Sequence, residues 1–250
     1  MAKAYSERVI VLGKVKLGET DAILPLLARD GRQVRAVAKG LRRPGNRFGA
    51  RLEPFTVVDV LLHPGKNLDV VSEARCVTTN AAARSGLVRP AAASYAAEFL
   101  DKLTRDGSAA GERVFALSEA AFAAIAGADD DEGAALLACA HVMKAMAMQG
   151  LRPALDACAL CGAPVDAGCA FDVGAGGRLC AACAPHAAGP RVDAALAGWV
   201  DVLVNMTFAE LAELADAPVH ALVEVSELWA HEHLGIRLKS ATFLKQLLFV

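Results

Sequence analysis

Four of the seven cysteines are spaced as two pairs that suit a metal ion. The chain contains Cys158-x-x-Cys161 and, after eighteen further residues, Cys180-x-x-Cys183. Each Cys-x-x-Cys turn brings two sulfurs together, and two such turns complete the four thiolates that zinc prefers. Because four thiolates leave no open position for water, the spacing predicts a structural zinc site and not a catalytic one.

The segment between the two pairs, residues 162–179, is rich in Gly and Ala. Such a ribbon has too little core to fold alone, so metal binding would stabilise it. Two alternatives stay open: disulfides, which are disfavoured in a cytosolic chain, and a knuckle without metal. Cys169 and His186 are spare ligands should one thiolate be displaced. Cys76 and Cys139 lie in apolar stretches and are expected to be small core residues.

Signatures of catalysis are missing from the sequence. His231-Glu232-His233 begins like a metalloprotease motif but lacks the second histidine four residues on, and on a helix the two histidines point to opposite sides. No phosphate-binding loop, dinucleotide fingerprint or nucleophile elbow occurs. No His-x-Glu precedes the cysteine pairs, as a zinc deaminase requires. We therefore expect that the protein is not an enzyme. The alternative is a metal-dependent hydrolase whose zinc is bound by cysteines.

Basic residues form a second group with possible chemistry. The chain has 26 Lys+Arg and 28 Asp+Glu; residues 1–90 hold 16 and 8 of these, so residues 91–250 hold 10 and 20. The front of the chain is therefore basic and the rest acidic, which indicates an anionic partner for the front. Guanidinium groups match the geometry of phosphates. The candidate nucleic-acid-binding residues are Lys14, Lys16, Arg35, Lys39, Arg42, Arg43, Arg47 and Arg51.

These basic residues need a scaffold that presents them together. Strand alternation places Arg35 and Lys39 on one face, and a flexible, positive loop is expected to follow. Phe48, at the far end of this loop, is expected to stack on a base. The scarcity of aromatic residues favours binding to the backbone regardless of sequence. The alternative is a solvated loop with no ligand.

Residues 5–80 have the alternation and turns of short strands. Residues 8–16 are expected to form one strand that carries Lys14 and Lys16 on one face. Pro25 makes the segment 22–28 an edge strand or a bulged one. Asp30-Gly31 predicts a tight turn. Five short strands in this length predict a small barrel.

The period becomes helical from residue 81 onward. Trp199 and Trp229 are expected to be buried anchors, and Phe243 is expected to face the core. No apolar run is long enough to span a membrane and no signal peptide is evident, so a cytoplasmic protein is expected. Apolar spacing predicts a first helix with Pro90 in its first turn and a second and third helix after it. Their apolar positions are Tyr95, Phe99 and Leu103 in the first, Phe115, Phe122 and Ile125 in the second, and the stripe Leu136, Ala140, Met143 and Ala147 in the third. Further helices are expected over residues 192–204, 218–234 and 241–248.

Several short motifs follow one another in a specific order. They are Gly18-Glu19-Thr20-Asp21, Ala36-Val37-Ala38-Lys39-Gly40-Leu41-Arg42-Arg43-Pro44, Phe48-Gly49-Ala50-Arg51-Leu52-Glu53-Pro54-Phe55, Gly150-Leu151-Arg152-Pro153 before Cys158-Ala159-Leu160-Cys161-Gly162, and Lys239-Ser240-Ala241-Thr242-Phe243-Leu244. In this order and spacing, along nearly the whole chain, the sequence resembles the RecO family of bacterial recombination mediators and DNA repair proteins.

The resemblance implies an α+β fold in two domains. Residues 1–80 would form an OB-fold β-barrel that binds nucleic acid. Residues 81–250 would form an α-helical bundle, with a small four-cysteine zinc module inserted at about 154–188. Some members of the family have lost some of the cysteines, whereas this chain keeps all four, so Zn²⁺ is expected as a structural cofactor.

The resemblance also implies a function. A family member binds single- and double-stranded DNA, anneals complementary strands, and helps RecA load onto DNA coated with single-stranded DNA-binding protein. It acts with RecR and in some cases RecF, without catalysis, in the cytoplasm at the nucleoid. A zinc-ribbon factor for protein interaction or transcription, without annealing activity, remains the alternative.

One further site is implied by the resemblance, for the acidic tail of single-stranded DNA-binding protein, which ends in apolar residues. The candidate residues combine basic and apolar side chains near the end of the chain. They are Arg237, Lys239, Phe243 and Lys245. The alternative is a packed C-terminal helix whose lysines extend to solvent.

Overall fold

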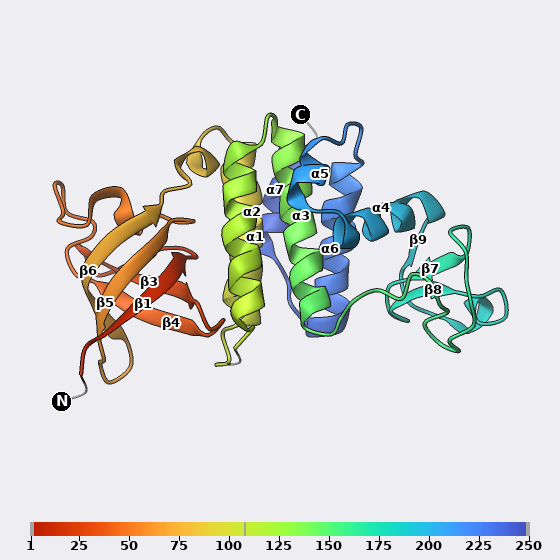
Figure 1. Cartoon of the computed structure of the whole chain (residues 1–250), viewed down its shortest axis with the longest axis horizontal. Helices are drawn as coiled ribbons and strands as arrows, with labels where there is room; N and C mark the ends of the chain where they lie inside the picture. Colours follow the sequence, from red (N-terminus) through yellow and green to blue (C-terminus); the bar gives the residue numbers. More distant parts are fainter. Residues whose placement is uncertain (1–2, 108, 249–250) are drawn as a thin grey trace. The chain divides into compact units, whose positions relative to one another are not determined.

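The computed structural model describes residues 3–107 and 109–248 and divides into two compact units, 1–127 and 128–250. The first unit begins with a closed, OB-like barrel (Figure 1). The sheet order is β1-β5-β6-β4-β3-β2, and pairing of β1 with β3 closes the barrel. The strands are β1 (Tyr5–Val11), β2 (Val15–Leu17), β3 (Asp21–Ala28), β4 (Gln33–Ala38), β5 (Val57–His63) and β6 (Asp69–Thr78).

Two details of the barrel differ from the sequence expectation. The single strand expected over residues 8–16 is divided into β1 and β2, and Lys14 lies in the break. β3 is an interior strand, not an edge or bulged one, because it pairs with β4 on one side and with β2 and then β1 on the other.

Pro25 fits inside β3 because of where its neighbours change. Pairing with β2 ends at Ile23 and pairing with β1 begins at Leu26, so Pro25 lies in the gap. Its carbonyl accepts a hydrogen bond from the Leu12 N–H at 2.9 Å. The nitrogen of a strand residue faces the same side as its carbonyl, so the missing N–H of Pro25 falls where no ladder bond is needed.

The interior of the barrel is filled from alternate strand positions and from the loop that follows β4. Val34, Ala36 and Ala38 are buried, whereas Arg35 is exposed, as alternation predicts. Phe48 and other apolar residues of the loop complete this core. The tight turn at Asp30-Gly31 is confirmed, because the Gly31 N–H donates to the Ala28 carbonyl at 2.9 Å.

Two helices complete the first unit: α1 (Val88–Leu103) and α2 (Glu112–Gly127). Gln33 of β4 donates its side-chain amide to the Asp101 carbonyl of α1 at 3.0 Å. The ring of Phe55 stacks on that of Phe122 of α2, with the centroids 5.4 Å apart. The first compact unit thus includes α1 and α2 and extends past residue 80. The expected domain boundary at residue 80 stays a prediction. Short 3₁₀ helices lie at η1 (Gly49–Leu52) and η2 (Ala81–Arg84).

The second unit is a helical bundle with a small ribbon. Its central helix is α3, whose residues 134–143 are all buried, so it is apolar around its circumference and not only along the expected stripe. Asp130 caps α3 by accepting the Gly133 N–H at 2.7 Å. The elements are α3 (Asp131–Met148), β7 (Ala170–Asp172), β8 (Gly177–Leu179), η3 (Ala184–His186), β9 (Arg191–Val192), α4 (Ala194–Asn205), α5 (Phe208–Ala212), α6 (Val219–Leu234) and α7 (Lys239–Leu247).

The expected anchors of the second unit divide into one that is buried and two that are not. Trp229 is buried, donates to the Leu151 carbonyl at 3.0 Å, and packs on Phe171 of the ribbon with ring centroids 5.9 Å apart. Trp199 is only half-buried, and Phe243 is 53% exposed, so the prediction that both face the core is wrong. None of the helices in the described parts of the chain is long and apolar enough to cross a membrane.

Candidate nucleic-acid interface and metal centre

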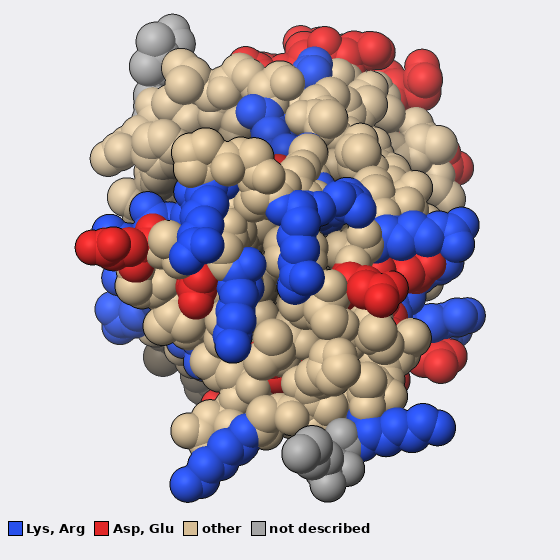
Figure 2. All heavy atoms as spheres, turned by 90° about the vertical axis from the view of Figure 1, so that its left-hand side faces the viewer, with Lys and Arg blue, Asp and Glu red and all other residues tan. Residues whose placement is uncertain are grey.

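The basic residues singled out from the sequence all lie exposed on the barrel and its loop. Figure 2 shows lysines and arginines spread over this face, with fewer acidic side chains between them. The exposed residues are Lys14, Lys16, Arg35, Lys39, Arg42, Arg43, Arg47 and Arg51. Their contacts, however, divide them into two groups.

The start of the loop after β4 is fastened to the turn that precedes β3. Arg42 donates its backbone N–H to the Thr20 carbonyl at 2.9 Å and its guanidinium to the Glu19 carbonyl at 3.0 Å. The Asp21 carboxylate accepts the Gly40 N–H at 2.8 Å and the Thr20 hydroxyl at 2.9 Å. The Gly40 N–H, and then the hydroxyl, hold the pKa of Asp21 below its ordinary value. The loop is therefore fastened and not flexible at this end.

The far end of the loop is fastened by Arg51. Its guanidinium donates to the carbonyls of Phe48 at 2.8 Å, Ala74 at 3.1 Å and Arg47. Asn46 adds a turn, since its side-chain oxygen accepts the Phe48 N–H at 3.0 Å. Phe48 is only 2% exposed, so the prediction that it stacks on a base is wrong.

The basic residues therefore have different roles in the structure. Arg42 and Arg51 satisfy backbone carbonyls, and Lys14 pairs with the Glu53 carboxylate at 2.6 Å. In the described part of the chain, the side chains of the remaining five make no ion pair and no hydrogen bond, so they keep their charges available to an anion. These are Lys16, Arg35, Lys39, Arg43 and Arg47.

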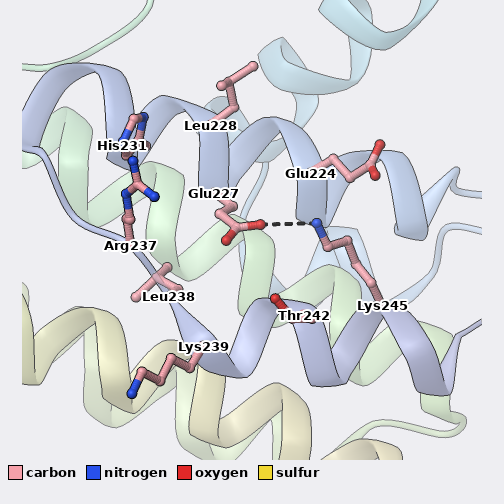
Figure 3. Close-up of a pocket in the computed structure, with 9 residues that line it drawn as sticks. All are labelled: Glu224, Glu227, Leu228, His231, Arg237, Leu238, Lys239, Thr242 and Lys245. Carbon is pink, nitrogen blue, oxygen red and sulfur yellow. Dashed lines mark hydrogen bonds and ion pairs between the residues drawn. The ribbon is translucent and has the colours of Figure 1, made fainter.

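A cavity of about 690 Å³ lies between α6 and α7 in the second unit (Figure 3). Leu228 and Leu238 give it an apolar part, and Lys245 forms an ion pair with Glu227 at 3.1 Å. Three of the four residues predicted for a partner tail line this cavity: Arg237, Lys239 and Lys245. Phe243 is not among its lining residues.

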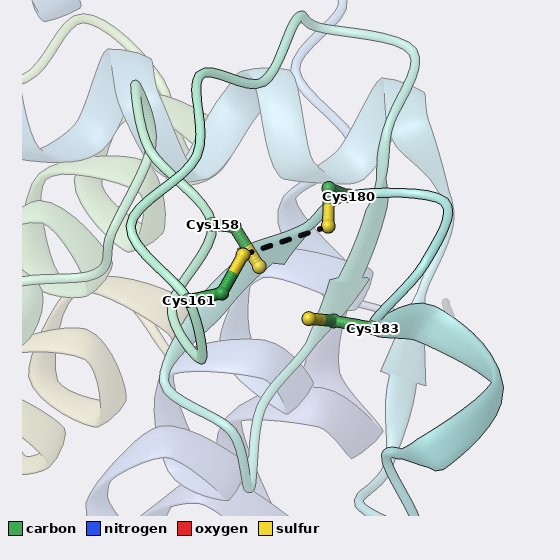
Figure 4. Close-up of side chains that lie close together, drawn as sticks. All are labelled: Cys158, Cys161, Cys180 and Cys183. Carbon is green, nitrogen blue, oxygen red and sulfur yellow. Dashed lines mark hydrogen bonds between the residues drawn. The ribbon is translucent and has the colours of Figure 1, made fainter.

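The four paired cysteines converge on one point in the ribbon (Figure 4). Their Sγ atoms all lie within 4.8 Å of one another, and those of Cys161 and Cys180 are 3.7 Å apart. Four sulfurs placed about 2.3 Å from a tetrahedral ion are about 3.8 Å from each other. The group therefore fits a metal ion. Cys169 and His186, the spare ligands, lie outside it.

Local backbone geometry builds both cysteine turns. The Gly162 N–H donates to the Cys158 carbonyl at 2.8 Å, and Gly162 has a φ of +74°, which glycine adopts without strain. The second turn is closed by the Cys183 N–H, which donates to the Cys180 carbonyl at 3.0 Å. Each of these short turns thus places two sulfurs by its own backbone hydrogen bond.

The crowded sulfurs differ in acidity. The backbone N–H of Cys180 is the main cause that lowers the pKa of Cys158 to about 6. The pKa of Cys183 is raised to about 12, chiefly because its thiol hydrogen-bonds to the sulfurs of Cys161 and Cys180. Four thiolates this close repel one another, so a cation is required for all of them to ionise together.

The other cysteines and histidines do not add to this centre. Cys139 is buried in α3, and burial raises the pKa of its thiol to about 12. Cys76 is half-buried on β6. Among the described residues, neither His231 nor His233 belongs to a group that can hold a metal ion.

The fold and these sites define a class: proteins with an OB-like barrel that carries exposed basic residues, followed by a helical unit with a four-cysteine centre. The chain belongs to the RecO family. Residues 1–80 match the family model described as Recombination protein O N terminal, and residues 84–242 match Recombination protein O C terminal. These two matches confirm the predicted family, and together with the barrel and the cysteine group they confirm the predicted fold class. The family comprises mediators of recombination and repair that bind DNA.

Proposed function

We propose that this chain binds single- and double-stranded DNA, anneals complementary strands, and with RecR helps RecA load onto DNA coated with single-stranded DNA-binding protein. The observation that supports this proposal most directly is the basic barrel and loop, on which five exposed cations keep side chains without an ion pair or hydrogen bond among the described residues. In some cases RecF also takes part in this process. The protein makes and breaks no covalent bond, so its work needs no catalytic residue.

The mechanism is electrostatic. Lys16, Arg35, Lys39, Arg43 and Arg47 neutralise phosphates and release counterions from the strand. Two strands held by these cations repel each other less, so complementary bases meet more often. Because hydrogen bonds already fix the loop, binding costs little ordering entropy.

We assign zinc as the metal and a structural role to it. Cys158, Cys161, Cys180 and Cys183 would hold it, and four thiolates are the ligand set that zinc prefers. The ion would supply positive charge that lets all four sulfurs ionise. The ribbon it stabilises packs through Phe171 on Trp229 of α6.

The cavity between α6 and α7 is our proposed site for the tail of single-stranded DNA-binding protein. Arg237, Lys239 and Lys245 suit acidic residues, and Leu228 and Leu238 suit the apolar end. In the free protein Lys245 forms an ion pair with Glu227. A carboxylate of the tail would therefore have to replace Glu227 as the partner of Lys245.

A strand-annealing assay tests the main proposal, with and without single-stranded DNA-binding protein, at two salt concentrations. We expect Arg43→Glu with Arg47→Glu to remove most annealing, and more so at high salt. Arg113→Glu, at an exposed position of α2, is the matched control and leaves annealing intact. Equal annealing by both variants would refute the assignment of the loop.

A peptide assay tests the tail site separately. An acidic peptide ending in an apolar residue should bind the protein, and Lys239→Glu should weaken binding severalfold. The same peptide without its apolar end should bind poorly. Phe243→Ala should have no effect because Phe243 lies outside the cavity. Binding unchanged by Lys239→Glu would place the tail elsewhere.

A further inference from the structure

A smaller cavity, of about 250 Å³, lies where the basic loop meets β6. It is open to solvent on the same unit that carries the proposed DNA-binding cations. Its lining combines two arginines, a buried ring, a hydroxyl and a carboxylate. The lining residues are Arg47, Phe48, Arg51, Ser72, Glu73 and Ala74.

The floor of this cavity is shaped by a bulge in β6. Leu61 of β5 pairs with Glu73, but Leu62 pairs with Val71, so Ser72 is the extra residue. The Ser72 hydroxyl donates to the Leu61 carbonyl at 3.1 Å, which replaces a ladder bond. Bulges of this kind redirect side chains beside binding sites, and here the bulge brings Ser72 and Glu73 to the cavity.

Arg47 presents a flat surface at the cavity. Its guanidinium carbon lies over the Phe48 ring, 4.7 Å from the ring centre, which is within the range of a cation–π contact. Phe48 itself is fixed in the barrel core and nearly inaccessible. The ring therefore supports Arg47 instead of meeting a ligand, and the outer face of the guanidinium is a plane on which a base can stack.

The other lining groups suit a base better than a phosphate. The guanidinium of Arg51 is already occupied by the carbonyls of Phe48, Arg47 and Ala74. The Glu73 carboxylate repels a phosphate but accepts hydrogen bonds from the amino and ring N–H groups of bases.

We propose that this cavity receives one unstacked base of single-stranded DNA, stacked on Arg47 and hydrogen-bonded to Glu73. The inference rests on the proposed function, because the neighbouring cations must hold the strand while the base turns inward. It changes the view of the face from a purely electrostatic surface to one that also contacts a base.

Equilibrium binding to two oligonucleotides tests this inference: an ordinary single strand and one of the same length built of abasic sites. We expect wild-type protein to bind the ordinary strand at least fivefold more tightly, since stacking one base is worth about 1–3 kcal/mol. Arg47→Lys keeps the charge but loses the plane, so it should remove most of this ratio. Arg113→Lys, at an exposed position of α2 outside the proposed DNA-binding residues, is the matched control and should retain it.

Glu73→Ala gives a second, independent readout. Loss of a negative charge should strengthen binding to the abasic strand, whereas loss of the acceptor should lower the ratio for the ordinary strand. Equal binding of both oligonucleotides by wild-type protein, or equal ratios for the two lysine variants, would overturn the base site. No binding of either oligonucleotide would instead refute the proposed DNA-binding function.

Discussion

The basic loop and the cysteine ribbon are both clusters of like charges, but they resolve the repulsion in different ways. In the loop, Arg42 and Arg51 donate to backbone carbonyls, and Asp21 contributes one carboxylate. In the ribbon, the crowded sulfurs raise the pKa of Cys183 to about 12. Groups of the same chain therefore hydrogen-bond or balance some of the charges of the loop, whereas the sulfurs of the ribbon need a metal ion to ionise together.

This difference separates the part that stabilises from the part that acts. A guanidinium whose N–H groups donate to carbonyls within the protein, such as that of Arg51, has fewer donors left for a ligand. An exposed guanidinium on the same loop whose side chain makes no hydrogen bond or ion pair among the described residues, such as that of Arg43, keeps its donors available to a ligand. Two exposed arginines of one loop, Arg43 and Arg51, can thus differ in role, and exposure alone does not distinguish them.

The largest effect is expected when the metal centre is broken. Cys180→Ser removes one ligand and should abolish stoichiometric zinc, since structural zinc contributes on the order of 10 kcal/mol to small zinc domains. We expect lower thermal stability and faster proteolysis within residues 154–188, measured together with metal content. Cys169→Ser, outside the cluster, should change neither. A Cys180→Ser protein that retains zinc would contradict the ligand set.

The next effect concerns two cations at the end of β4: Arg35 within the strand and Lys39 directly after it. Arg35→Ala with Lys39→Ala removes two phosphate contacts, so the log–log salt dependence for single strands should become shallower by about 1.4. Affinity should fall on the order of tenfold for all sequences alike. Fluorescence anisotropy over a salt series measures both. An unchanged slope would mean that this face of β4 does not meet DNA.

A smaller effect distinguishes two neighbours in the loop. Arg42→Ala frees the carbonyl of Glu19 and loosens the loop, so amide exchange should rise around residues 18–21 and 40–43. Arg43→Ala should leave exchange unchanged and make the salt slope shallower by about 0.7. If both variants altered only the slope, Arg42 would be a DNA contact and not an anchor.

Local patterns in the sequence predicted what depends on local structure. The cysteine centre was predictable because each pair lies within one turn, and the turns place the sulfurs without help from distant residues. The exposure of Arg35 between buried Val34 and Ala36 followed from strand alternation alone.

Contacts between distant residues decided the rest. Phe48 is buried because the loop turns back into the barrel, a path that no local pattern records. Arg51 reaches the Ala74 carbonyl 23 residues away, so its structural role was not evident from its charge. The interior position of Pro25 depends on where two partner strands change over. The capping box of α5, Thr207 with Glu210, was a local signal that went unread.

The smallest effect is a pH dependence carried by Asp21. Hydrogen bonds from Gly40 and Thr20 hold its pKa below the unfolded value of about 3.9. A lowered pKa contributes stability that is fully present above the unfolded value and is lost as pH falls through the folded one. Asp21→Asn can still accept the Gly40 N–H but does not titrate. The difference in melting temperature between wild type and Asp21→Asn should therefore be constant above about pH 5 and shrink toward pH 3. A difference that stays constant down to pH 3 would show that the carboxylate is not the group that fastens the loop.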